Sequence, residues 1–291
     1  MFQSIDDLMA RLEEANYFLD RDAATVIYLA WQMKRPLLVE GPAGVGKTEL
    51  AKTLAQVSQR ELIRLQCYEG LDESKALYEW DYQKQLLWIQ ANMQGNLDWA
   101  AAKTAIYGEE FLLARPLLKA LLAPKETVLL IDELDKSEEE FESFLLETLS
   151  EYQVTIPEYG TVAAVSIPVI IITSNNAREF SEALRRRCFH LYLDFPGPER
   201  ELSILRRKLP ELEERLGREV ISFVQLLRKQ NLKKSPSIAE TLDWAKALVG
   251  LKTKSLDRNL VQNTMALLLK YREDYQTITK KLDQLLVSGV G

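Results

Sequence analysis

A glycine-rich segment has the composition and spacing of a phosphate-binding loop. It runs Gly41-Pro-Ala-Gly-Val-Gly-Lys-Thr48 and fits the pattern G-x-x-x-x-G-K-[ST]. Glycines in such a loop let backbone N–H groups curl around phosphate oxygens, the lysine reaches the outer phosphates, and the hydroxyl binds magnesium. The sequence therefore assigns phosphate binding to Gly41, Pro42, Ala43, Gly44, Val45, Gly46, Lys47 and Thr48, and a metal contact to Thr48 as well.

Two adjacent carboxylates follow an apolar run further along the chain. The run Val128-Leu-Leu-Ile-Asp-Glu133 predicts a buried strand with both carboxylates at its carboxyl end, where ligands bind in open α/β sheets. We expect Asp132 to hold magnesium and Glu133 to orient or deprotonate an attacking water. An acidic pair alone is equally typical of a surface, but behind a phosphate loop it predicts hydrolysis of a phosphoanhydride.

A polar amide follows another predicted strand, in Ile171-Ile-Thr-Ser-Asn-Asn176. Asn175 is the residue expected between the catalytic carboxylate and the terminal phosphate, and Asn176 is the second choice. On local sequence alone, an asparagine that simply ends the strand in a turn is an equal alternative.

Three consecutive arginines precede the last predicted strand, in Leu184-Arg-Arg-Arg-Cys188. The fixed charge and planar donors of arginine suit phosphate recognition, and an arginine from a neighbouring subunit can stabilise the transferring phosphoryl group. Such a role requires an oligomer, and we expect it of Arg186 or Arg187. A solvated basic helix end is the alternative for at least one of the three.

Hydrophobic periodicity predicts the elements that position these residues. Apolar runs indicate strands at residues 36–40, 61–67, 127–132, 168–173 and 189–195, and helical patterns lie between them. This order predicts an α/β fold with a parallel sheet covered by helices on both faces. A helix over 137–149 would begin with a capping box of Ser137 and Glu140, and residues 153–164 predict a hairpin.

The strand signal ends at Phe195-Pro-Gly-Pro198, and the remaining residues indicate only helices. We therefore predict two domains, an α/β domain over residues 1–196 and a smaller helical domain over residues 197–291. One helix of the second domain is expected to begin with Ser235 as its N-cap and Pro236 at its first position.

Composition excludes several other classes of protein. The 291 residues include 43 acidic and 37 basic side chains, so the net charge is −6 and a nucleic-acid-coating protein is not expected. Cys67 and Cys188 lie far apart without CxxC spacing, which predicts free thiols rather than disulfides or a cysteine-rich zinc site. A single histidine, His190, cannot supply a two-histidine metal site. The acidic start and short apolar runs predict a cytoplasmic protein without a membrane span.

Two smaller features carry alternatives. Cys188 follows three arginines, so its thiol could have a lowered pKa, but a small core residue is the better interpretation. The aromatic residues Tyr78, Trp80, Tyr82 and Trp88 predict a strand or hairpin that could grip a client protein or line a pore. Their alternative role, anchoring this segment on its own domain, is favoured by the usual burial of aromatic side chains.

In these motifs and their order, the chain resembles AAA+ ATPases, most closely the MoxR-like branch that includes CoxD, CbbQ and NorQ type proteins. The resemblance implies a P-loop AAA+ core followed by a small all-helical lid domain. It makes residues 41–48 the Walker A loop, Asp132 and Glu133 the Walker B pair, and Asn175 the sensor-1 residue. It also implies an arginine finger at Arg186 or Arg187, a pre-sensor-1 hairpin at 153–164 and a helix-2 insertion between residues 68 and 127.

One departure from the family concerns the lid. Related proteins often carry a sensor-2 arginine just after a Ser-Pro pair, but the run here is Ser235-Pro-Ser-Ile-Ala-Glu240, without arginine. Lys233 and Lys234 are weak substitutes.

The resemblance also implies a function: hydrolysis of ATP with Mg²⁺ by a homo-oligomeric ring, a hexamer in related proteins. Such proteins remodel a partner or mature a metalloenzyme client such as carbon monoxide dehydrogenase or Rubisco, together with a von Willebrand factor A domain protein. A nucleic-acid motor or loader on the same core is the alternative, which the acidic composition disfavours. A signalling GTPase would need an N-K-x-D run that the chain lacks, and a non-catalytic scaffold would not need Glu133.

Overall fold

The computed structural model describes residues 2–92 and 105–290, with side chains up to residue 286. The chain forms two compact units. Unit 1 comprises Met1–Arg11, Leu19–Gly41 and Lys47–Tyr192. Unit 2 comprises Leu12–Phe18, Pro42–Gly46 and Leu193–Gly291.

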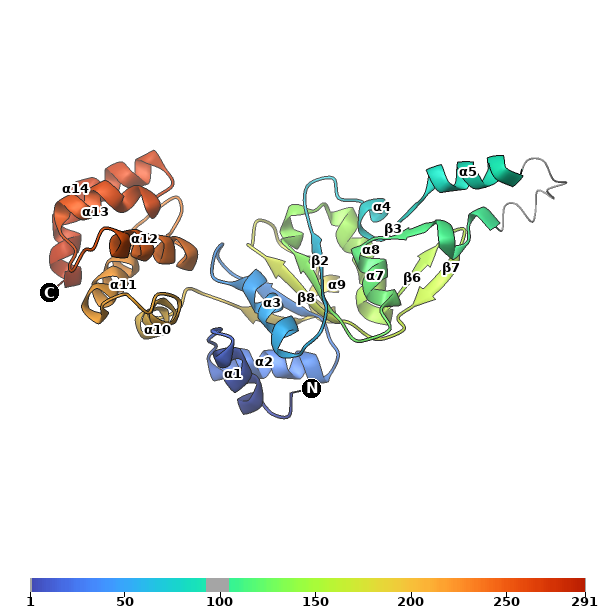
Figure 1. Ribbon diagram of the computed structural model, residues 1–291, viewed down its shortest axis with the longest axis horizontal. Coiled ribbons are helices and arrows are strands. Elements are labelled where there is room, and N and C mark those ends of the chain that lie inside the picture. Colours follow the sequence, from blue (N-terminus) through green and yellow to red (C-terminus); the bar gives the residue numbers. More distant parts are fainter. Residues whose placement is uncertain (1, 93–104, 291) are drawn as a thin grey trace. The chain divides into compact units, whose positions relative to one another are not determined.

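Unit 1 is built on a five-stranded sheet in the order β2-β5-β8-β1-β9, and every neighbouring pair is parallel (Figure 1). The strands are β1 Leu37–Glu40, β2 Leu62–Gln66, β5 Val128–Asp132, β8 Val169–Ser174 and β9 Phe189–Tyr192. Every residue of β1 and β5 is buried, as expected for parallel strands covered on both faces. The predicted parallel sheet is thus confirmed, and all five carboxyl ends lie at one edge.

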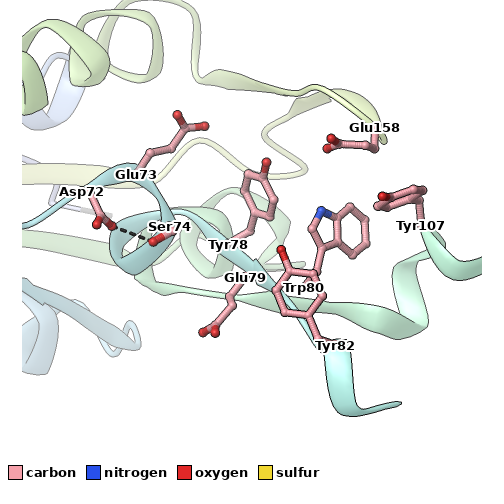
Figure 2. A pocket seen from close by; sticks show the side chains of 9 residues that line it. All are labelled: Asp72, Glu73, Ser74, Tyr78, Glu79, Trp80, Tyr82, Tyr107 and Glu158. Atoms are coloured by element: carbon pink, nitrogen blue, oxygen red, sulfur yellow. Dashed lines mark hydrogen bonds between the residues drawn. The ribbon is translucent and has the colours of Figure 1, made fainter. Parts of the chain in front are cut away.

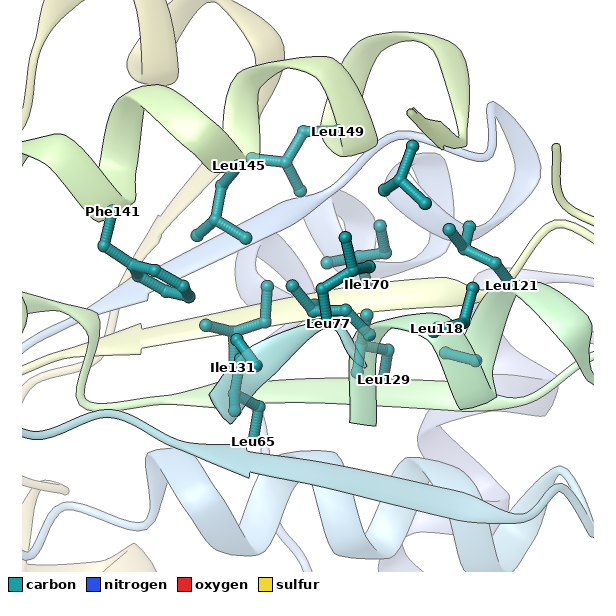
Figure 3. Close-up of a cluster of buried hydrophobic side chains, with 14 of the residues drawn as sticks. Leu65, Leu77, Leu118, Leu121, Leu129, Ile131, Phe141, Leu145, Leu149 and Ile170 are labelled. Carbon is teal, nitrogen blue, oxygen red and sulfur yellow. The ribbon is translucent and has the colours of Figure 1, made fainter. Parts of the chain in front are cut away.

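Helices cover both faces of this sheet. They include α2 Arg21–Gln32, α3 Lys47–Val57, α7 Pro116–Leu122, α8 Glu139–Glu151 and α9 Glu182–Arg187, and α1 Ile5–Glu14 precedes them. Figure 3 shows α8 on one face of the sheet, with Phe141, Leu145 and Leu149 pointing toward the strands, and α3 on the other face. Each of these side chains is at most 4% exposed, so each contributes about 1.5–3 kcal/mol by leaving water.

The start of α8 differs from the sequence prediction. Its N-cap is Glu138, whose side chain makes no capping hydrogen bond. Ser137 instead donates its hydroxyl to the carbonyl of Leu134, at 2.8 Å, within the short 3-10 turn η2 Leu134–Lys136. The predicted capping box of Ser137 and Glu140 is therefore wrong, because Ser137 ends this turn and α8 begins at Glu139, with Glu138 as its N-cap.

Unit 1 also contains two antiparallel strand pairs outside the five-stranded sheet. The first, β6 Gln153–Ile156 with β7 Gly160–Ala163, is antiparallel and confirms the predicted hairpin. The second pairs β3 Tyr78–Trp80 with β4 Leu112–Ala114. It is accompanied by α4 Glu73–Ala76, α5 Tyr82–Asn92 and η1 Glu109–Phe111.

The predicted strand over the aromatic cluster is confirmed only in part. Tyr78 and Trp80 lie on β3, but Tyr82 and Trp88 lie on the helix α5. Residues 93–104, which belong to the expected helix-2 insertion, lie outside the described residues.

Unit 2 contains a helical core. Its helices are α10 Pro198–Lys208, α11 Glu214–Arg228, α12 Ile238–Gly250, α13 Arg258–Thr264 and α14 Arg272–Val290, with the 3-10 turn η3 Met265–Leu267. Phe223 and Trp244 pack against each other in the centre, with ring centroids 5.6 Å apart. Helix α12 begins two residues later than predicted, because its N-cap is Ser237, which forms a capping box with Glu240. The prediction of Ser235 as N-cap and Pro236 as first residue is wrong.

Candidate active site

The glycine-rich loop connects the end of β1 to the start of α3. Gly44 and Gly46 have φ values of 80° and 102°, a region that side-chain-bearing residues rarely adopt. The loop therefore depends on these glycines for its course. It ends at the N-terminus of an eleven-residue helix, whose free N–H groups and dipole favour an anion.

Lys47, the lysine of the loop pattern, is the first residue of α3 and only 6% exposed. Its ammonium donates to the carbonyl of Gly41 at 2.7 Å and to Oδ1 of Asn175 at 2.9 Å. Burial lowers the pKa of Lys47, while the nearby carboxylates of Asp135, Glu133 and Asp132 act in the opposite direction. Lys47 and Asn175, each predicted for the site, are thus in direct contact.

Asp132 is buried at the end of β5 and is surrounded by donors. Its Oδ1 accepts from the hydroxyls of Thr48 at 2.9 Å and Thr173 at 2.6 Å. Its Oδ2 accepts from Nε and a terminal nitrogen of Arg64, at 3.0 and 2.6 Å. The Arg64 guanidinium supplies the opposite charge that a carboxylate with 1% exposure needs.

The side chains of Thr48 and Asp132 also fit a magnesium ion. The hydroxyl of Thr48 and a carboxylate oxygen of Asp132 lie 2.9 Å apart, and both are hard oxygen donors of the kind that Mg²⁺ prefers. The structure brings these two residues together as the sequence predicts.

Glu133 adopts a left-handed backbone conformation, with φ 57° and ψ 49°, where the chain leaves β5. Its Oε2 accepts from Nζ of Lys136 at 2.7 Å and from the amide of Gln66 at 2.8 Å. Its Oε1 accepts from Nδ2 of Asn175 at 3.3 Å. The hydrogen bond and charge of Lys136 lower the pKa of Glu133 against the effect of burial. The carboxylate is therefore ionised at neutral pH.

Asp135 fixes the loop that follows β8. Its Oδ2 accepts from the backbone N–H groups of Asn175 and Ala177, each at 3.0 Å. Its Oδ1 is buried and has no hydrogen-bond partner in the described part of the chain. Asp135 therefore positions the backbone from which the Asn175 amide reaches Lys47 and Glu133.

The three arginines of α9 have different surroundings. Arg185 makes two hydrogen bonds of 3.2 Å to the buried carboxylate of Glu40. Arg187 contacts the hydroxyl of Ser150 and donates to the carbonyl of Ala183 at 3.0 Å. Arg186 has a side chain 75% exposed, and among the residues that the structure describes it forms an ion pair only with the exposed Glu182, at 2.9 Å, which costs little to break. Arg186 is thus the most accessible of the three.

The lysines near the start of α12 are both paired within unit 2. Lys234 lies 2.9 Å from the carboxylate of Glu240, and Lys233 pairs with Glu273. The Glu240 carboxylate therefore has two partners. It accepts from the backbone N–H of Ser237 in the capping box and from the ammonium of Lys234.

Sequence reasoning missed five side chains of the site. They are Arg64, Gln66, Thr173, Asp135 and Lys136. The last two lie two and three positions after Glu133, so their position was a usable signal. The other three lie on β2 and β8, and their proximity depends on which strands are neighbours.

The remaining polar candidates have structural roles. Cys67 and Cys188 are buried free thiols, and burial raises the pKa of each to about 12. The lowered pKa considered for Cys188 is wrong, and its interpretation as a core residue is confirmed. His190 contacts the carboxylate of Glu40 beside Arg185.

Residues 2–92 and 105–290 lack two further features. None of the helices there combines the length and the apolar composition needed to cross a bilayer. That part of the chain also contains no group of three or more His, Cys, Asp or Glu side chains placed to hold a metal ion together.

Comparisons with known proteins show which sequences and structures this chain is similar to. The model of the AAA domain, dynein-related subfamily, matches residues 36–188. Uncharacterized proteins of Staphylococcus epidermidis and Staphylococcus saprophyticus are 25% and 22% identical over 227 and 231 residues, covering 76% of this chain and 78% of each relative. Among solved structures, the RuvB Holliday junction branch migration motor of Thermotoga maritima has a TM-score of 0.47 and 15% identity, covering 91% of this chain and 72% of that one.

Proposed function

The chain belongs to the AAA domain family, dynein-related subfamily, and from this membership we propose that it hydrolyses ATP with Mg²⁺. One observation carries the proposal. One hydrogen-bonded network lies at the carboxyl ends of β5 and β8. Asn175 joins the Lys47 ammonium to the Glu133 carboxylate. Asp132 accepts from the hydroxyls of Thr48 and Thr173. A phosphate-binding lysine, a cation-binding pair and an ionised base are the groups that phosphoanhydride hydrolysis requires.

Each residue then has a defined task. Residues 41–48 hold the phosphates through backbone N–H groups, and Lys47 exchanges Gly41 and Asn175 for phosphate oxygens. Thr48 and Asp132 would hold magnesium, which when bound neutralises charge on the phosphates. Glu133 orients the attacking water and accepts its proton, while Asn175 lies between Glu133 and Lys47.

In this structure, hydrogen bonds from neighbouring side chains occupy the carboxylate of Glu133, the proposed base. Three donors, from Lys136, Gln66 and Asn175, share its two oxygens. A carboxylate so engaged is a weak base, so we propose that at least the Gln66 contact is released when the base acts on water.

We also propose that Arg186 acts on the terminal phosphate of a neighbouring subunit in a ring. Its exposure and its weak pairing with Glu182 leave it able to reach another molecule, whereas Arg185 is paired with the buried Glu40. Arg187 is the second candidate, because it must leave Ser150 and Ala183 to do so. The ring is a hexamer if the chain follows the MoxR-like proteins that it resembles.

The finer role that we propose is remodelling of a protein in the cytoplasm, with a von Willebrand factor A domain partner and a metalloenzyme client. The acidic composition supports a protein rather than a nucleic-acid substrate. Exposed leucines on α5 add support, because Leu86 and Leu87 are 59% and 67% exposed and offer apolar contacts. A nucleic-acid motor remains the second candidate, and salt-dependent DNA binding would favour it.

The substitution Glu133→Gln tests the proposed hydrolysis. The amide keeps the shape of the side chain but cannot accept a proton, so turnover should fall about a hundredfold or more while ATP binding persists. The measurement is phosphate release alongside binding of a fluorescent ATP analogue. Glu140→Gln, at an exposed carboxylate of α8, is the matched control and should behave as the wild type. Undiminished turnover in Glu133→Gln would exclude Glu133 as the base.

A further inference from the structure

A groove of about 610 Å³ in unit 1 is lined by aromatic and acidic side chains (Figure 2). We call it the aromatic–acidic groove. It is lined by Glu73, Tyr78, Trp80, Tyr82, Tyr107 and Glu158, among others. These residues come from α4, β3, the start of α5, the segment before η1 and the turn between β6 and β7. None of them belongs to the ATP site described above.

The aromatic rings form a packed floor with accessible edges. Trp80 is 6% exposed, and its ring lies edge-on to Tyr78 and Tyr107, with centroids 5.9 and 5.1 Å away. Tyr82, at 64% exposure, borders the same groove. Trp80 therefore anchors this segment on its own domain, as its aromatic composition indicated, while tyrosines are left to contact a ligand.

The indole N–H of Trp80 is a donor without an acceptor. Its Nε1 is buried and has no hydrogen-bond partner among the residues that the structure describes. A buried N–H without a partner costs about 1–3 kcal/mol. Because Nε1 is covered, a ligand carbonyl can accept from it, and so remove that cost, when a neighbouring side chain of the groove moves aside.

The negative charge of the groove is not fully compensated. Neither Glu73 nor Glu158 makes an ion pair with a described residue, whereas Glu79 nearby pairs with Arg115. Loss of water, and then the charges of Glu158 and Glu73, raise the pKa of Tyr78, so both carboxylates act on the interior of the groove. Burial, with Glu147, also raises the pKa of Glu73.

These carboxylates do not converge on a metal ion. Within residues 2–92 and 105–290, no group of three or more metal-binding side chains occurs, in the groove or elsewhere. Carboxylates beside aromatic faces instead suit an organic cation, because a guanidinium or ammonium against those faces is stabilised by the ring quadrupole.

We propose that the aromatic–acidic groove binds an arginine or lysine side chain presented by an extended segment of a partner protein. The cation lies between Glu73 and Glu158 against the tyrosine rings, and a backbone carbonyl of the same segment accepts from the Trp80 indole. A volume of about 610 Å³ accommodates such a side chain together with the flanking backbone. The remodelling of that partner rests on the proposed function, whereas binding to the groove does not require hydrolysis.

Fluorescence polarisation of labelled peptides tests the site in the full chain. One peptide alternates glycine with arginine, a second alternates glycine with lysine, and a third alternates glycine with glutamine. The two cationic peptides should bind, more weakly as salt increases, and the glutamine peptide should not bind. Equal binding of all three, or no binding of either cationic peptide at low salt, would overturn the proposal.

Two variants place the binding in the groove. Glu73→Gln with Glu158→Gln should weaken binding of the cationic peptide about tenfold, and Tyr82→Ala about threefold, since each removes one part of the cation site. Glu140→Gln, an exposed carboxylate that does not line the groove, should leave binding unchanged. If the double variant binds as the wild type does, the groove is not the site.

Light scattering and ATPase measurements on the same variants distinguish peptide binding from self-association and from hydrolysis. The double variant should keep the wild-type mass and turnover. A change of mass without a change of peptide affinity would make the groove a contact between copies of the chain and refute the proposal. A wild-type chain that binds the arginine peptide without hydrolysing ATP would retain this site and refute the proposed ATPase function alone.

Discussion

Thr173 ties the two acidic residues of the site to each other. Its hydroxyl donates to Asp132 at 2.6 Å and accepts from the backbone N–H of Glu133 at 2.8 Å. One hydroxyl therefore sets both the side chain that is proposed to hold magnesium and the backbone that carries the proposed base. Such a residue acts by positioning.

Replacing Thr173 by valine should separate this role from packing, because the side chain keeps its shape and loses both hydrogen bonds. The Glu133 N–H and part of Asp132 would be left unpaired, so we expect the free energy of unfolding to fall by about 1–3 kcal/mol. Urea unfolding and the magnesium dependence of ATP-analogue binding are the measurements. Thr155→Val on the exposed side of the β6–β7 hairpin is the control. An unchanged magnesium dependence in Thr173→Val would remove Thr173 from the site.

The two thiols should be unreactive in the folded protein. With a pKa of about 12, only about one in ten thousand is a thiolate at pH 8, against about a tenth at the ordinary value of 9.0. Titration with a chromogenic disulfide at pH 8 should show almost no reaction of Cys67 or Cys188, and full reaction of both in urea. Rapid modification of the native chain would show that these sites open.

The sequence predicts those site residues that lie in short local motifs, but not those that neighbouring strands of the sheet bring to the site. Lys47, Asp132 and Glu133 are recognisable because each lies in a short pattern. Arg64 and Gln66 lie on β2, and they reach the acidic pair only because β2 is the neighbour of β5, with Gln66 opposite Asp132. That neighbour relation is a product of tertiary packing, and local sequence does not contain it.

The spacing Ser-x-x-Glu predicts a capping box correctly at the start of one helix and wrongly at the start of another. Ser237 and Glu240 have the spacing of a capping box and form one, with the Ser237 hydroxyl accepting from Glu240 N–H at 3.2 Å. Ser137 and Glu140 have the same spacing and do not, because Ser137 ends the turn η2 and α8 begins one residue later, with Glu138 as its N-cap. The pattern therefore fails where a preceding turn displaces the start of the helix.

Ser237→Ala should destabilise unit 2 by about 1 kcal/mol, the usual value of an N-cap hydroxyl. Thermal unfolding followed by circular dichroism would show this as a lower midpoint. Ser235→Ala is the matched control, since Ser235 was the predicted N-cap but does not cap the helix. A larger loss in the control than in Ser237→Ala would contradict the observed start of α12.

At the scale of the whole molecule, the proposed site is shared between subunits, with Glu133 from one and Arg186 from the next. Composition and motifs could suggest such an assembly, but no feature of a single chain fixes its number of subunits. Closed rings arise when the same head-to-tail interface repeats around an axis, so each interface would combine residues of two chains.

Mixing two inactive variants tests this arrangement. Glu133→Gln and Arg186→Ala should each abolish turnover alone, yet an equal mixture should recover about a quarter of wild-type activity, since that share of random interfaces has both residues intact. Steady-state ATPase activity of the mixture is the measurement, with Arg187→Ala in place of Arg186→Ala as the comparison. A mixture as inactive as its components would place the arginine elsewhere.

The strand order also bears on how the protein is made. Lys47 and Asn175 are in contact although 128 positions separate them, and β1 lies beside β8. A ribosome releases β1 long before β8. In that interval the nascent chain contains the whole phosphate loop but lacks Asn175, which contacts Lys47 in the folded protein. We therefore expect a stalled nascent chain ending before Val169 to be unable to retain ATP-agarose, and one that extends through unit 1 to be retained. Synthesis itself would thus delay nucleotide capture until the sheet is complete.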